Sequence, residues 1–132
     1  MANDPRDDTS ILSEDRLLRR VPPNQLFTEP DGSQRPTSAV FRHDELSVNI
    51  ESLMVEQHRR PEDALTGFPE DSLTAITAGD VRAFGYPIVK DVDPPNDPAH
   101  GLVLGKKTSR FANAMVRAHR WIVVPAKIED LG

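Results

Sequence analysis

The stretch GLVLGKKTSRFANAMVRA, residues 101–118, decides the fold class because it places an apolar strand directly before an amphipathic helix. Residues 101–104 form a short, continuous apolar run, which is typical of a buried strand. Thr108 or Ser109 then supplies an N-cap for a helix. Apolar residues recur after it at i, i+3, i+4, i+7 and i+11, the spacing of one helix face: Phe111, Ala114, Met115, Ala118 and Ile122.

Upstream of this stretch, the chain alternates between short strands and short helices. Leu46, Val48 and Ile50 alternate with polar residues, the period-two pattern of a half-buried strand. Further strands are predicted over 73–76, 87–89 and 121–124. Thr77 and Asp80 predict the start of a short helix, which Gly85 ends.

Turn chemistry predicts a hairpin near the N-terminus. Residues 26–28 and 38–41 are expected to be its strands, and they flank Pro30-Asp31-Gly32-Ser33. Proline presets the first turn position and glycine accepts a positive φ. Residues 11–20 predict either a short docking helix or an edge strand, and short helices are expected over 53–58 and 61–65.

These elements predict a small single α+β domain over residues 14–128. We expect a mixed, mostly antiparallel sheet of about five strands, with one main C-terminal helix packed on it and short additional helices. Residues 1–13 are polar and lack apolar spacing, so they predict a disordered N-terminal tail. Residues 129–132 are expected to be a C-terminal tail.

Composition narrows the functional class. The 132 residues contain no cysteine, which excludes disulfides and cysteine-ligated zinc. The N-terminus has no basic start followed by an apolar run, and no apolar stretch reaches the roughly 20 residues that span a bilayer. The sequence therefore predicts a soluble, cytoplasmic protein without a membrane partner.

Charge is unevenly distributed along the chain. Residues 61–100 carry 2 basic side chains against 8 acidic ones, whereas residues 101–132 carry 6 basic side chains against 2 acidic ones. Such asymmetry can steer a charged partner, or the two regions can pair within the fold.

The glycine–lysine segment 101–108 invites comparison with a phosphate-binding loop. That loop needs four residues between its glycines and Lys-Ser/Thr directly after the second. Here three residues separate Gly101 from Gly105, and Lys106-Lys107-Thr108 follows. Nucleotide hydrolysis is therefore not expected, and the sequence indicates no cofactor.

Basic residues follow the polar side of the C-terminal helix. Arg110, Asn113, Arg117 and Arg120 recur at steps of three and four, and two lysines extend the patch. The predicted binding residues are Lys106, Lys107, Arg110, Arg117, Arg120 and Trp121. An arginine beside a tryptophan is typical of interface hot spots, although a lone tryptophan also commonly closes a core.

An acidic, proline-rich loop precedes the strand at 101–104. Its catalytic candidates are His100, Asp91, Asp93 and Asp97. Carboxylates beside an imidazole can act as acid and base if they come within hydrogen-bond reach. Proline occupies positions that must ligate or turn in a helix–loop–helix calcium site, so no metal site is expected.

Three functional hypotheses follow. The favoured one is a non-enzymatic accessory or adaptor protein that binds another protein within a larger complex, because no complete catalytic motif is present. The second is binding of nucleic acid or a phosphorylated ligand through the basic helix face. The third is a small hydrolase or transferase that depends on His100 and a carboxylate.

Overall fold

The computed structural model describes residues 4–125, and these form one α+β domain. Its main sheet has six strands in the order β6-β7-β4-β1-β5-β8, and every pairing is antiparallel. The strands are β1 (Arg16–Val21), β4 (Glu45–Ile50), β5 (Ser72–Thr77), β6 (Ile88–Lys90), β7 (His100–Leu104) and β8 (Arg120–Val123). The expected fold class is confirmed, with one strand more than predicted.

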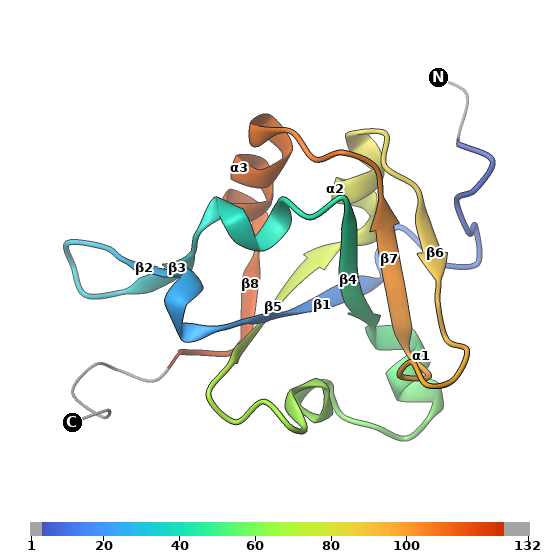
Figure 1. Cartoon of the computed structure of the whole chain (residues 1–132), viewed down its shortest axis with the longest axis horizontal. Coiled ribbons are helices and arrows are strands. Elements are labelled where there is room, and N and C mark those ends of the chain that lie inside the picture. Colours follow the sequence, from blue (N-terminus) through green and yellow to red (C-terminus); the bar gives the residue numbers. More distant parts are fainter. Residues whose placement is uncertain (1–3, 126–132) are drawn as a thin grey trace.

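Helical segments cover both faces of this sheet. The longer helices are α1 (Glu51–Glu56), α2 (Ala78–Ala83) and α3 (Ser109–Ala118). The 3₁₀ helices are η1 (Pro23–Gln25), η2 (Ser38–Phe41) and η3 (Pro61–Leu65). In Figure 1, α2 and α3 lie on one side of the sheet, and α1 lies on the other.

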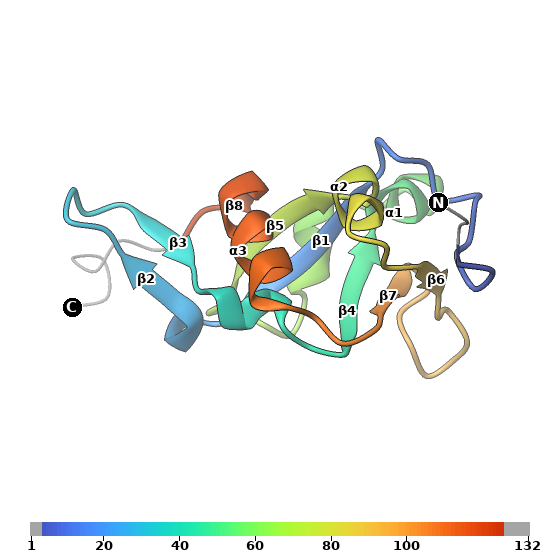
Figure 2. The same ribbon diagram turned by 90° about the horizontal axis from the view of Figure 1, so that it is seen from above.

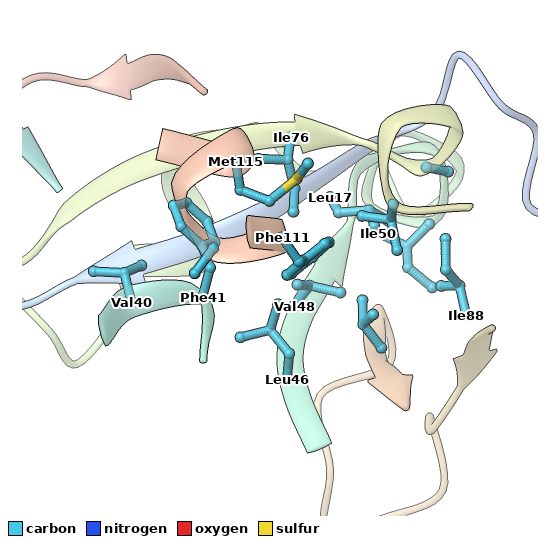
Figure 3. Close-up of a cluster of buried hydrophobic side chains, with 14 of the residues drawn as sticks. Leu17, Val40, Phe41, Leu46, Val48, Ile50, Ile76, Ile88, Phe111 and Met115 are labelled. Carbon is cyan, nitrogen blue, oxygen red and sulfur yellow. The ribbon is translucent and has the colours of Figure 1, made fainter. Parts of the chain in front are cut away.

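The larger core fills the space between α3 and the sheet. Phe111 and Met115 of α3 are fully buried against Leu17 and Ile50 (Figure 3). Thr108 caps the helix, because its side chain accepts a hydrogen bond from the Phe111 N–H at 3.1 Å. The predicted amphipathic helix is thus present, and its apolar face is buried.

That helix ends earlier than the apolar spacing suggested. His119 is extended, with φ −58° and ψ 155°, and the chain turns directly into β8. Ile122 therefore lies in β8 and packs with a second core on the opposite face of the sheet. The expectation that Ile122 continues the helix face was wrong.

The hairpin near the N-terminus forms, but with a different second strand. β2 (Leu26–Thr28) pairs with β3 (Gln34–Pro36), and the pair projects from the body of the domain (Figure 2). The predicted strand over 38–41 is instead η2, because its apolar side chains Val40 and Phe41 are buried against α3.

The expected N-terminal tail differs from the structure over residues 4–13. Ile11 is fully buried, and the Asp8 N–H donates to the Ile88 carbonyl at 2.8 Å. The Asp7 carboxylate accepts hydrogen bonds from Ile88 N–H and Arg82. Polar composition here reflects hydrogen bonding along β6 rather than disorder, and an edge strand gains protection from it.

Residues 11–20 were predicted to form a short docking helix or an edge strand. Instead, the chain from Arg16 onward forms β1, which lies between β4 and β5 in the centre of the sheet. The predicted C-terminal tail at 129–132 lies outside the described residues.

Candidate functional site

A polar cleft of ≈ 680 Å³ opens on the sheet face opposite α3. We call it the β4–β7 cleft. Its floor comes from β1, β4 and β7, and its walls come from η3 with the following loop and from the loop between β6 and β7. The residues that line it are Leu18, Arg19, Arg20, Ser47, Val48, Asn49, Arg59, Asp63, Ala64, Thr66, Phe68, Pro95, Asn96, Asp97 and His100.

Strand register sets the positions of the floor residues. Asn49 is the Cα partner of His100 across β4 and β7, and of Leu18 across β4 and β1. Directly opposed residues in a sheet project from the same face. The carboxamide of Asn49 therefore lies between an imidazole and an apolar side chain.

Asn49 is the most enclosed polar residue of the cleft. It is 8% exposed, and its side chain makes no hydrogen bond to any other residue within 4–125. Its polar atoms keep some exposure, since no fully buried side-chain polar atom in that range lacks a partner. A carboxamide offers two donors and an acceptor, and these groups are available to a molecule bound in the cleft.

His100 enters the cleft from the first position of β7. Its Nδ1 lies 3.0 Å from Asp91 Oδ2 and 3.2 Å from the Asp91 carbonyl oxygen. Asp91 accepts at both atoms, so Nδ1 carries the proton in this arrangement. The neutral ring then has its lone pair on Nε2, and Nε2 has no partner within the described residues.

A carboxylate that orients an imidazole through Nδ1 is the arrangement by which proteins build a general base. His100 lines the cleft, whereas Asp91 is not part of its lining. The pair can accept a proton from a molecule held on the Asn49 side.

The loop wall of the cleft is held by Arg59. Its guanidinium donates to both oxygens of Asp97, at 2.9 and 2.8 Å. Arg59, with the Ala99 N–H assisting, holds the pKa of Asp97 below its usual range. Asp97 is therefore an anchored anion and a poor proton acceptor.

The β1 part of the floor presents a cation that has no ion pair within residues 4–125. The Arg20 guanidinium stacks over the Phe68 ring, 3.8 Å from its centroid. In the described part of the chain it makes no ion pair and no hydrogen bond. Stacking covers the face of the guanidinium and leaves its in-plane N–H groups free.

Of the four catalytic candidates, the structure brings three together. His100 contacts Asp91, and Asp97 lines the same cleft. Asp93 is exposed and does not line the cleft.

The predicted binding residues comprise an exposed group and two residues that are buried or half-buried, Lys107 and Trp121. Four of them are exposed and make no ion pair with any residue of the described chain. We call them the cationic surface: Lys106, Arg110, Arg117 and Arg120. Arg120 is the first residue of β8 rather than part of α3.

Lys107 is not part of that surface. It is 4% exposed, and its Nζ donates to the carbonyl oxygens of Asp44, Val103 and Gly105. Burial lowers the pKa of Lys107 to about 8. The side chain ties the β7–α3 connection to the segment before β4.

Trp121 is half-buried. Its Nε1 donates to the Gln34 carbonyl at 3.1 Å, and its ring packs edge-on against His119. It therefore joins β8 to the β2–β3 hairpin.

Sequence reasoning missed Asn49, Arg20 and Arg59. Asn49 was predicted only as a polar position of an alternating strand, which is correct but does not show what lies above it. Its proximity to His100 depends on the pairing of β4 with β7, which are separated by about fifty residues of sequence.

Comparisons of the chain with protein-family models, with curated proteins and with solved structures found no match. Within residues 4–125, no helix has the length and apolarity to cross a bilayer. No three histidine or carboxylate side chains in that range are grouped as metal ligands.

Proposed function

We propose that the protein binds a small polar molecule in the β4–β7 cleft and moves a proton through His100, in the manner of a small hydrolase or transferase. The observation that carries this proposal is the 3.0 Å contact between His100 Nδ1 and Asp91 Oδ2, with the same ring lining the cleft. A general base needs an orienting partner and access to a bound molecule, and His100 has both.

The volume and lining of the cleft support the same proposal. Small-molecule sites commonly occupy about 300–1,000 Å³, and the cleft falls within that range. The lining combines polar side chains with the apolar side chains of Leu18 and Ala64. Fixed polar groups beside apolar surface orient a ligand and exclude part of its water.

In the proposed reaction, His100 Nε2 removes a proton from a bound water. The water oxygen forms a bond to an acyl carbon, and the bond from that carbon to the leaving group breaks. The N–H groups of Asn49 stabilise the negative oxygen that develops, and His100 then releases its proton to the leaving group or to solvent.

Hydrolysis of p-nitrophenyl acetate tests this proposal, because release of p-nitrophenolate needs only a positioned base and water. His100→Gln should lower the rate about 100-fold, the contribution typical of a general base. Asp91→Asn should lower it as well, since the ring loses the carboxylate that orients it. His43→Gln is the matched control, because that imidazole is exposed and outside the cleft.

Two outcomes would overturn the proposal. One is a wild-type rate no higher than that of buffer. The other is a rate that falls equally in His100→Gln and His43→Gln, since the reaction would then come from any surface imidazole.

The cationic surface favours a second candidate, in which the protein is an accessory protein that binds an acidic protein partner. Its four positive side chains are exposed, and none is neutralised within residues 4–125. Fluorescence anisotropy with a decaglutamate peptide tests it. Binding should weaken steeply with salt and disappear in the double variant Arg110→Gln, Arg117→Gln.

Tighter binding of a single-stranded oligonucleotide than of the peptide would favour nucleic acid instead. Absence of binding to both would remove this candidate.

A further inference from the structure

We infer that the molecule bound in the β4–β7 cleft is a small carboxylate that also carries an amide, such as an N-acylated amino acid. This inference rests on the ligand site proposed above and names the chemistry of its ligand. It is carried by two polar side chains on the cleft surface that have no partner among the described residues, Arg20 and Asn49.

Arg20 supplies the recognition of an anion. Its guanidinium is held against Phe68, so its position is set before a ligand arrives. The in-plane N–H groups form a fork that matches the two oxygens of a carboxylate. Preorganisation of this kind lowers the entropic cost of binding.

The other charges in the cleft leave Arg20 as its available cation. Arg59 is engaged by Asp97 through two hydrogen bonds. Arg19, which also lines the cleft, donates to the carbonyl oxygens of Val40 and Ser47. Asp63, the other carboxylate of the lining, accepts the Arg60 N–H at 2.8 Å. Each carboxylate that lines the cleft thus has a donor of its own, whereas Arg20 has no acceptor within the described residues.

Asn49 supplies the recognition of an amide. A carboxamide presents N–H donors and a carbonyl acceptor, and the carbonyl oxygen of a ligand amide accepts from its N–H. A purely apolar ligand would leave this 8%-exposed side chain unpaired, at a cost in affinity.

Sheet geometry sets the distance between the two groups. Asn49 is paired with Leu18, and Arg20 is two residues further along β1 on the same face. Diagonal neighbours in a sheet have Cα atoms about 7–8 Å apart. A carboxylate and an amide separated by one or two carbon atoms span the gap left by two side chains at that distance.

This arrangement places the amide between the carboxylate site and the imidazole. His100 is opposite Asn49 on β7, on the side away from β1. A water held by Nε2 would then approach the carbonyl carbon of the same amide.

Titration of the full-length ¹⁵N-labelled protein with three probes tests the inference. The probes are N-acetylglycine, its neutral analogue N-acetylglycinamide and inorganic phosphate, all at one ionic strength. N-acetylglycine should bind with a Kd on the order of 1 mM, the affinity typical of so small a ligand. Its binding should shift the backbone amides of Asn49 and His100.

The neutral amide should bind about tenfold more weakly, because it lacks the charge-assisted hydrogen bonds to Arg20. Arg20→Gln should weaken binding of the acid about tenfold and leave binding of the neutral amide unchanged. Arg60→Gln is the matched control, since Arg60 is exposed and lies outside the lining. If Arg20→Gln does not fold, Arg20→Lys replaces it, with a smaller loss expected because the fork is removed and the charge kept.

Equal affinity for the acid and the neutral amide would overturn the inference, as would equal effects of Arg20→Gln and Arg60→Gln. Tighter binding of phosphate than of N-acetylglycine would assign the anion site to a phosphorylated ligand instead. Binding is measured here without turnover, so its loss is distinguishable from loss of the proposed acid–base role. Retained binding with no hydrolysis of p-nitrophenyl acetate would contradict that role alone.

Discussion

Arg59 and Asp97 face each other as a bidentate pair, with donor–acceptor distances of 2.9 and 2.8 Å, and join the segment after α1 to the loop between β6 and β7. Gln57 strengthens the same link, because its side chain donates to the Pro98 carbonyl at 3.0 Å. The two contacts hold one wall of the β4–β7 cleft in place although nearly forty residues of sequence separate their ends.

Breaking this pair should loosen the loop. Asp97→Asn removes the charge and one strong acceptor, and the pair is only partly shielded from solvent, so we expect a loss of about 1 kcal/mol in unfolding free energy. Hydrogen exchange over residues 91–98 should accelerate. Glu62→Gln, which breaks the exposed Arg60–Glu62 pair, is the control and should change neither quantity measurably.

Replacement of Lys107 should lower the free energy of unfolding, whereas replacement of its neighbour Lys106 should not. Lys107→Met would remove a donor from three backbone carbonyls, of which that of Asp44 keeps a second donor, the Gly105 N–H. Loss of the donor to a buried acceptor costs about 2 kcal/mol. Lys106→Met changes an exposed side chain and should stay within about 0.5 kcal/mol of the wild type. Urea unfolding measures both, and equal losses would contradict the structural role given to Lys107.

Stability should decrease in mild acid because of His119. Its Nδ1 lies 2.7 Å from Thr74 Oγ1, and burial, with Arg120 adding to it, lowers its pKa below 6.5. The unfolded chain therefore takes up more protons here than the folded chain, so the stability of the folded state is lost as the pH falls below about 6.5. Burial also lowers the pKa of His43, which acts in the same direction.

Urea midpoints measured between pH 7.5 and 5 check this dependence. His119→Gln should show a shallower slope than the wild type, since the titrating group is gone. Identical slopes would show that the pH dependence has another origin.

Gly101 should tolerate no side chain. A Cβ there would lie 2.8 Å from Ile50 Cδ1 and 3.1 Å from the Val89 carbonyl oxygen. Gly101→Ala is therefore expected to destabilise by about 1–3 kcal/mol through overpacking. Adding Ile50→Val, which removes the colliding methyl group, should recover part of that loss in a double-mutant cycle measured by thermal unfolding.

Much of the local structure could be predicted from sequence, because its signals are themselves local. The N-caps at Thr108 and Thr77 and the turn around Gly32 each depend on a few adjacent residues, and the structure contains all three. His100 and Asp91 were also predicted as candidates to act together, since a short loop separates them.

The features that could not be predicted depend on contacts between segments that are far apart in the sequence. Val40 and Phe41 were predicted to lie in a strand. They lie in a 3₁₀ helix instead, in which both side chains are buried against α3. Lys107 was predicted as a binding residue, but its Nζ donates to carbonyl oxygens of β7, of the loop after it and of the segment before β4, and the side chain is buried.

The cleft itself depends on the same long-range pairing. Asn49, Arg20 and Arg59 come from separate elements, and each has an unremarkable sequence context. Their convergence needs the strand order β7-β4-β1, which no local pattern encodes.

The protonation state of His100 tests the central claim most directly. Long-range ¹H–¹⁵N correlation spectra of the wild type in alkaline buffer should show the proton on Nδ1, hydrogen-bonded to Asp91, and Nε2 unprotonated. Asp91→Asn should redistribute the proton between the two nitrogens. A wild-type ring that carries its proton on Nε2 would contradict the account, because Nε2 could not then act as the proposed proton acceptor.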